Sequence, residues 1–200
     1  MKEAVLYTGT FDPFHLGHLW QIERTYSAHP FEKVVIAMIS ENPKKPNATG
    51  WDKRKKLAEL MLASKILPFE VEIYPIDYVQ PEKLKDFTAQ HLSGYRVMRT
   101  IASDVIVEFA KDTDFNFNNA LLLFHYAVVV RPLVGEVEMA RAIAALPQDI
   151  RSKLSYEIVH VQTENDISGT NIRKNPIKAY VDGYITHSQL KFIEKNSLYL

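Results

Sequence analysis

Two histidines three residues apart, His15 and His18, follow the pair Gly9 and Thr10. On a helix, residues three apart are neighbours, so both imidazoles would share one face. Glycine lets the backbone approach an anion without a Cβ in the way, and Thr10 adds a hydroxyl beside its own N–H. Together these residue types can bind a polyphosphate. A zinc helix needs histidines four apart, and the chain has no cysteine, so we predict no protein-bound metal here.

A second polar segment, Ile167-Ser-Gly-Thr-Asn-Ile-Arg173, lies near the other end of the chain. Serine and threonine at the start of a helix accept hydrogen bonds from its unpaired N–H groups. Arg173, one helical turn further on, can point back at an anion. Taken alone, the segment fits a plain helix cap. Paired with the two histidines, it predicts a second phosphate-binding element.

Both segments follow short apolar runs, and such runs predict strands. The runs lie at residues 4–7, 34–39, 70–76, 95–101, 126–130 and 156–161. Helical patterns separate them, which is typical of an α/β fold with a doubly wound, mainly parallel sheet. We expect residues 1–200 to form one domain. Ligands of such sheets bind beyond the carboxyl ends of the strands, where both polar segments would meet.

A polar stretch from Asn42 to Gly50 follows the second run, so we expect it at the same edge of the sheet. Lys44 and Lys45 in this stretch could neutralise the phosphate of an acceptor or of a nucleoside triphosphate. The alternative is a solvated basic loop. We predict a phosphate contact for at least one of these lysines.

The string Gly9-Thr-Phe-Asp-Pro-Phe-His-Leu-Gly-His18 resembles the (H/T)xGH signature of the nucleotidyltransferase superfamily. The segment at 167–173 resembles the superfamily's C-terminal S-[ST]-T-x-I-R element. The resemblance implies a Rossmann-like fold and transfer of a nucleotidyl group from a nucleoside triphosphate to a phosphate acceptor. The catalytic residues that we expect are His15, His18, Thr170 and Arg173. Those expected to bind ATP are Gly9, Thr10, Phe11, Gly17, Asp104, Ile167, Ser168 and Gly169.

Such a transfer proceeds by in-line attack of the acceptor phosphate on the α-phosphorus, and pyrophosphate leaves. No covalent enzyme intermediate is needed. Positioning and charge stabilisation then supply most of the catalysis, with roughly 3 kcal/mol from each well-placed donor. Mg²⁺ should accompany ATP, because two polyanions otherwise repel each other.

Further segments resemble the nicotinate and nicotinamide mononucleotide adenylyltransferases of NAD biosynthesis. Ala102-Ser-Asp104 is similar to their G-x-D element, whose aspartate contacts the nucleotide ribose region. The same Asp104 could also be the N-cap of a helix over 105–109. Arg131, at the end of the strand-like run, is similar to the arginine of their V-V-x-R-P element, and it could otherwise form a surface ion pair. The stretch from Val181 to Tyr199 is similar to their closing helix and tail, a C-terminal helical segment.

The residues that would bind the acceptor match these families less closely. Phe115 or Phe117 could stack on a pyridine ring, or belong to the core. The acceptor-binding residues that we expect are Thr10, Lys44, Lys45, Phe115, Phe117 and Arg131. Alanine at 102 and threonine at 8 depart from the family's glycines, and its carboxylate-reading segment is not recognisable around 78–84. Nicotinate and nicotinamide therefore stay open, as do pantetheine phosphate, a small alcohol phosphate with CTP, and a nucleotide-binding regulator without turnover.

The composition of the chain limits which kinds of partner it can bind. Twenty-four basic and 24 acidic residues give a formal net charge of zero, which disfavours a nucleic-acid or membrane partner. No apolar run approaches the ~20 residues of a membrane span, and the first strand begins without a signal-peptide pattern. We therefore expect a cytoplasmic enzyme that binds ATP and a phosphorylated small molecule. The enzyme could form a homo-oligomer.

Overall fold

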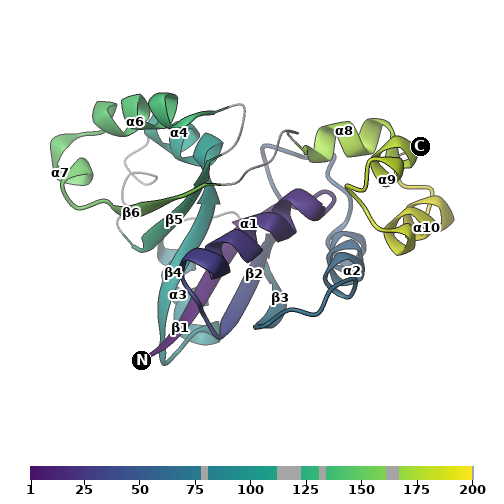
Figure 1. The fold of residues 1–200 in the computed structure, drawn as a ribbon, viewed down its shortest axis with the longest axis horizontal. Helices are drawn as coiled ribbons and strands as arrows, with labels where there is room; N and C mark the ends of the chain where they lie inside the picture. Colours follow the sequence, from purple (N-terminus) through teal and green to yellow (C-terminus); the bar gives the residue numbers. More distant parts are fainter. Residues whose placement is uncertain (78–80, 112–122, 131–133, 161–166, 200) are drawn as a thin grey trace.

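The protein is described here by a computed structural model that covers residues 1–77, 81–111, 123–130, 134–160 and 167–199. A six-stranded sheet forms its centre, in the order β3-β2-β1-β4-β5-β6 (Figure 1). All five strand pairings are parallel. The strands are β1 (Lys2–Gly9), β2 (Lys33–Ile39), β3 (Glu70–Ile76), β4 (Tyr95–Ala102), β5 (His125–Val130) and β6 (Ser155–His160). The predicted doubly wound parallel sheet is thus confirmed.

The chain starts in the middle of this sheet and changes direction once. It runs outward from β1 through β2 to β3, and then crosses to β4 on the other side of β1 before continuing to β5 and β6. A crevice opens at such a switch point, beyond the carboxyl ends of the central strands. That is the edge at which β1 ends in Gly9.

Strand β1 shows why the apolar runs became strands. Val5 and Tyr7 point into one hydrophobic cluster, and Ala4 and Leu6 point into another on the opposite face. Parallel strands covered on both faces need apolar residues at successive positions instead of alternate ones. A short continuous run is therefore the pattern of a central strand in this fold.

Helices cover both faces of the sheet. One face packs against α1 (Leu16–Ala28) and α2 (Trp51–Leu62). The other packs against α3 (Pro81–His91), α4 (Ser103–Lys111) and α6 (Glu136–Ala145), with the short α7 (Gln148–Arg151) following α6 (Figure 1).

Three short helices form the C-terminal segment and gather at one end of the molecule beside α2 (Figure 1). They are α8 (Gly169–Lys174), α9 (Pro176–Val181) and α10 (His187–Lys195). Gln189 of α10 is fully buried, and its side-chain amide donates to the carbonyls of Phe14 and Leu57, both at 2.8 Å. The C-terminal segment is therefore fastened to the loop that follows β1, as well as to α2.

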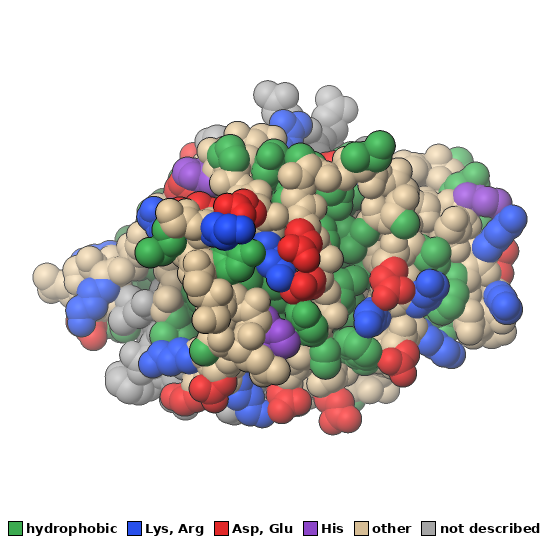
Figure 2. Space-filling view, turned by 90° about the horizontal axis from the view of Figure 1, so that it is seen from below, with side chains coloured by type: hydrophobic (Ala, Val, Ile, Leu, Met, Phe, Trp, Pro, Cys, Tyr) green, Lys and Arg blue, Asp and Glu red, His purple; other side chains and the backbone are tan. Residues whose placement is uncertain are grey.

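The surface carries both signs of charge side by side. On the face seen in Figure 2, basic and acidic side chains are interspersed and no single-sign field stands out. Some of the charged side chains form ion pairs, for example Lys33 with Glu72 at 2.7 Å. Within the described ranges, no helix has the length and apolarity to cross a membrane.

Candidate active site

The two histidines lie at the start of α1. His15 is the N-cap residue, and its backbone N–H donates to Nδ1 of His18 at 3.2 Å. The two rings stack, with 3.8 Å between their centroids. Phe11 and Phe14 flank the ring of His18 at 5.0 and 5.2 Å. The spacing of three residues thus places both imidazoles together beyond the end of β1.

Gly9, Thr10 and Phe11 form the turn between β1 and α1. A Cβ on Gly9 would lie 2.8 Å from the ring of Phe11, so the absence of a side chain makes room for that ring. Phe11 is buried in the core, with φ at 50°. We had expected the open side of Gly9 to face an anion. In the structure this space is filled by the aromatic ring instead.

The second polar segment packs directly onto the first. A Cβ on Gly17 would lie 3.1 Å from the ring of His15 and 3.3 Å from Cβ of Ile167. A Cβ on Gly169 would lie 2.8 Å from the carbonyl oxygen of Asp12. Both glycines therefore permit close contact between two segments that are far apart in sequence.

Arg173 joins the two segments by hydrogen bonds. Its Nη1 donates to the carbonyl of Asp12 at 2.5 Å, and its Nη2 donates to Oγ1 of Thr170 at 3.2 Å. The side chain is 35% exposed. Ser168 caps α8 by accepting from the backbone N–H of Asn171 at 3.2 Å, as a helix cap should. Ser168 caps the helix, and Arg173 still lies at the rim of the site, the edge beyond the carboxyl ends of the strands. The segment can therefore be a helix cap and a phosphate-binding element at the same time.

Asp12 is the point at which four segments meet, namely its own turn, the loop after β2, α8 and the C-terminal tail, and nothing in its local sequence indicates this role. The hydroxyl of Tyr199 donates to its Oδ1 at 2.5 Å, and the backbone N–H of Thr49 donates to its Oδ2 at 3.2 Å. Burial, followed by the hydrogen bond to Asp12, raises the pKa of Tyr199 well above its usual range. The phenol therefore keeps its proton to a higher pH than an exposed tyrosine does.

Arg54 of α2 binds the main chain at the ends of β1 and β2. Only 1% of Arg54 is exposed, and its guanidinium donates to the carbonyls of Thr10, Ile39 (2.9 Å) and Ser40 (2.8 Å). Burial lowers its pKa. This arginine holds main-chain oxygens in place at the ends of both strands.

Thr10 is held from the neighbouring loop. Its hydroxyl accepts a hydrogen bond from Nδ2 of Asn42 at 2.7 Å, and the residue is buried. In the same loop, Lys44 forms an ion pair with Glu108 of α4 at 2.9 Å, and Lys45 is exposed. The pair joins the loop after β2 to the helix after β4. The predicted lysine loop therefore lies beside the turn after β1.

Asp104 lies in the first turn of α4 but is not its cap. The sequence left open an N-cap role for Asp104 beside the ribose contact, but the helix already begins at Ser103, directly after β4. The hydroxyl of Ser103 donates to the carbonyl of Val134 at 2.7 Å, which holds the helix start. Three predicted acceptor contacts, Phe115, Phe117 and Arg131, lie outside the described residues.

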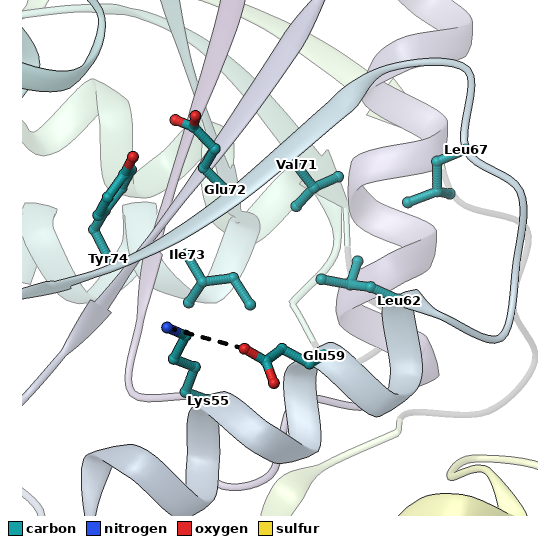
Figure 3. Close-up of a pocket in the computed structure, with 8 residues that line it drawn as sticks. All are labelled: Lys55, Glu59, Leu62, Leu67, Val71, Glu72, Ile73 and Tyr74. Carbon is teal, nitrogen blue, oxygen red and sulfur yellow. Dashed lines mark ion pairs between the residues drawn. The ribbon is translucent and has the colours of Figure 1, made fainter.

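A cavity of about 470 Å³ opens between α2 and the edge strand β3 (Figure 3). Lys55 and Glu59 of α2 form an ion pair across its wall at 3.9 Å, and Ile73 of β3 lies beside them. No predicted site residue lines this cavity. Across the described ranges, no group of three His, Cys, Asp or Glu side chains can hold a metal ion.

Comparison with known families identifies the fold. The model of the cytidylyltransferase-like family matches residues 6–175, which include both polar segments. The chain belongs to this family.

Several proteins are similar to this cytidylyltransferase-like chain, over all or part of its length. A probable nicotinate-nucleotide adenylyltransferase of Clostridium botulinum is 26% identical, over 100% of this chain and 98% of the relative. A phosphopantetheine adenylyltransferase of Natranaerobius thermophilus is 32% identical, over 41% of this chain and 50% of the relative. The nicotinic acid mononucleotide adenylyltransferase of Plasmodium falciparum, complexed with APC, superposes with a TM-score of 0.77 at 16% identity, over 100% of this chain and 98% of that one. The last likeness extends the agreement in fold to the whole chain.

Proposed function

We propose that this protein is an adenylyltransferase that transfers AMP from ATP to nicotinate or nicotinamide mononucleotide and releases pyrophosphate. The observation that carries the proposal is the junction of the two polar segments, where Nη1 of Arg173 donates to the carbonyl of Asp12. That contact sets a cationic side chain beside the helix start with the paired histidines. The relative named as a probable nicotinate-nucleotide adenylyltransferase matches over almost all of both chains and favours nicotinate mononucleotide.

The proposed reaction is a direct displacement. An oxygen of the acceptor phosphate forms a bond to the α-phosphorus of ATP, and the bond from that phosphorus to the bridging oxygen breaks. Pyrophosphate leaves with the electron pair. His15, His18, Thr170 and Arg173 are the proposed donors to the oxygens on which negative charge builds. The N-terminus of α1, a helix thirteen residues long, adds the positive end of the helix dipole.

Mg²⁺ is the proposed companion of ATP. The described residues provide no carboxylate cluster for a resident ion, so the phosphate oxygens of ATP would hold it. It would supply positive charge that offsets repulsion between the two anionic substrates.

The acceptor is proposed to bind on the side of the lysine loop. Lys44 and Lys45 follow β2 and provide cations for a phosphate, and the ion pair with Glu108 keeps Lys44 near α4. Thr10, Phe115, Phe117 and Arg131 complete the proposed acceptor-binding set. Asp104, in the first turn of α4, is the proposed ribose contact.

A phosphopantetheine adenylyltransferase is the second candidate, because one such enzyme is 32% identical over 41% of this chain. That match covers a local part of the chain, whereas the nicotinate-nucleotide relative covers all of it. The same chemistry at the α-phosphorus would serve both acceptors.

A single comparative assay separates these candidates. Purified protein with ATP and Mg²⁺ is given nicotinate mononucleotide, nicotinamide mononucleotide or 4′-phosphopantetheine, and pyrophosphate release is measured. We expect the largest kcat/KM with nicotinate mononucleotide. A preference for 4′-phosphopantetheine would move the assignment to the second candidate. ATP binding without pyrophosphate release from any acceptor would instead favour a nucleotide-binding regulator.

A further inference from the structure

The C-terminal tail reaches the loop after β1 through one side chain. Tyr199 is 187 residues from Asp12 in sequence, yet its hydroxyl donates to Oδ1 of that aspartate at 2.5 Å. Leu198 beside it is buried in the C-terminal cluster. Ser197 and Tyr199 have φ values of 49° and 61°, a region that non-glycine residues rarely adopt. The buried side chain of Leu198 and the bond of Tyr199 to Asp12 hold the tail in place.

Asp12 connects this tail to the arginine at the rim. Its carboxylate accepts from Tyr199 and from the backbone of Thr49, while its main-chain carbonyl accepts from Arg173. Nη1 of Arg173 is also 4.0 Å from the carboxylate Oδ2. Gly169 lies against the same carbonyl, closer than a Cβ would allow. A shift of Asp12 would therefore move the anchor of the guanidinium and the start of α8 together.

We propose that Tyr199 is a positioning residue for ATP: its hydroxyl fixes Asp12, and the main chain of Asp12 fixes the guanidinium of Arg173 at the rim. This inference rests on the proposed function. Hydrogen-bond donors that are already oriented before the substrate arrives cost little reorganisation energy. Their orientation depends on the neighbouring residues that hold them in place. Tyr199 would act behind Arg173, without touching the nucleotide.

The chemistry of the contact suits this role. A hydrogen bond to an ionised carboxylate is stronger than one between neutral groups, and losing it leaves a buried oxygen short of a donor. A tyrosine phenol is protonated across the physiological pH range, so this donor is always present there. The other carboxylate oxygen of Asp12 keeps its bond to Thr49, so a loss of Tyr199 should loosen the aspartate without releasing it.

The first test removes only the hydroxyl. Tyr199→Phe keeps the ring, and Tyr180→Phe is the matched control, since Tyr180 is an exposed tyrosine on α9 in the same segment. Binding of α,β-methylene-ATP with Mg²⁺ is measured by calorimetry, so no acceptor is needed. We expect about tenfold weaker binding for Tyr199→Phe and less than a twofold change for the control. In turnover, the KM for ATP should rise more than kcat falls.

A double-mutant cycle with Arg173→Ala separates positioning from general destabilisation. If Tyr199 acts through Arg173, the tenfold effect should shrink to less than twofold in the Arg173→Ala background. Equal effects in both backgrounds, or unchanged analogue binding by Tyr199→Phe, would overturn the inference. If the wild type transfers AMP but the cycle shows no coupling between Tyr199 and Arg173, only this inference fails and the proposed function stands. Conversely, analogue binding with a positive cycle but no transfer to any acceptor would defeat the proposed function alone.

A measurement on the wild type covers the case in which Tyr199→Phe does not fold. Coupling between two sites is reciprocal, so ATP must stabilise the tail if the tail supports ATP binding. Hydrogen exchange of the amides at 196–199 should slow severalfold with saturating α,β-methylene-ATP, and should not slow in Arg173→Ala. Unchanged exchange in the liganded wild type would overturn the inference, and a wild type that binds no analogue would overturn both proposals.

Discussion

The backbone N–H of His15 donates to Nδ1 of His18 at 3.2 Å, so a single hydrogen bond decides which nitrogen of His18 carries the proton. A nitrogen that accepts a hydrogen bond cannot be protonated, and neutral His18 must therefore carry its proton on Nε2. The same bond caps the first turn of α1 and orients the ring. His18 is thereby prepared to donate from Nε2 to an anionic oxygen.

This geometry predicts the effect of removing the donor. His18→Ala should lower kcat by about 100-fold or more with a smaller change in ATP affinity, because the contact strengthens as charge develops in the transition state. His18→Asn is the matched variant, since its amide oxygen can still accept from His15 while the Nε2 donor is lost. Steady-state kinetics of both variants checks this, and a near-normal kcat in either would remove His18 from the mechanism.

Arg173→Ala should raise the KM for ATP by about tenfold or more while the protein stays folded. One third of the side chain is exposed, and its two described hydrogen bonds go to a main-chain carbonyl and to a threonine hydroxyl. Arg173→Lys keeps the charge but not the planar fork, so we expect only partial recovery. The melting temperature of each variant is measured together with its steady-state kinetics. A variant that unfolds instead would assign Arg173 a structural role.

Local patterns carried most of the information about the fold. The apolar runs predicted all six strands, because a strand covered on both faces must be apolar at successive positions. The spacing of His15 and His18 predicted that both imidazoles share one face, because three residues make almost one helical turn, and in the structure the two rings stack. In each case, the sequence pattern and the structure that it predicts lie within one short segment.

The supporting contacts could not be predicted in the same way. Tyr199 and Asp12 meet across 187 residues, and nothing in either segment indicates the other. Arg54 lies in a helix rich in lysine, where a charged residue normally faces solvent, yet it is buried and bonds to the segments after β1 and β2. The start of α4 at Ser103 depends on a bond to Val134, which follows β5. Each of these depends on how distant segments pack.

Arg54 should matter for stability more than for chemistry. Arg54→Met keeps much of the volume but leaves several carbonyl oxygens at the ends of β1 and β2 without their donor, and each buried unpaired group costs about 1–3 kcal/mol. We expect the free energy of unfolding to fall by about 3 kcal/mol or more, measured by urea denaturation. A loss below about 1 kcal/mol would mean that these carbonyls find other partners.

Gly169→Ala tests the contact between the two polar segments. The new methyl would lie 2.8 Å from the carbonyl of Asp12, and because that atom is main chain, α8 or the loop must shift. Overpacking of this kind costs about 1–3 kcal/mol. We expect a lower melting temperature and a raised KM for ATP, since Arg173 moves with α8. Gly50→Ala is the control, because open space surrounds that position, and equal behaviour of the two variants would contradict the contact.

The last prediction concerns alkaline pH. The folded-state pKa of Tyr199 is raised above the ordinary value of 10.0, first by burial and then by its bond to Asp12. A raised folded pKa means that the unfolded chain releases this proton first, so the stabilisation is complete below about pH 10 and is lost as the pH rises toward the folded pKa. Tyr126, whose pKa is also raised by burial, contributes in the same direction. Denaturant unfolding at several pH values above 10 should therefore show a shallower loss of stability in Tyr199→Phe than in the wild type, whereas Tyr180→Phe should follow the wild type. Parallel pH profiles for the wild type and Tyr199→Phe would mean that the Tyr199 phenol ionises equally in both states, and that its bond to Asp12 does not persist in solution.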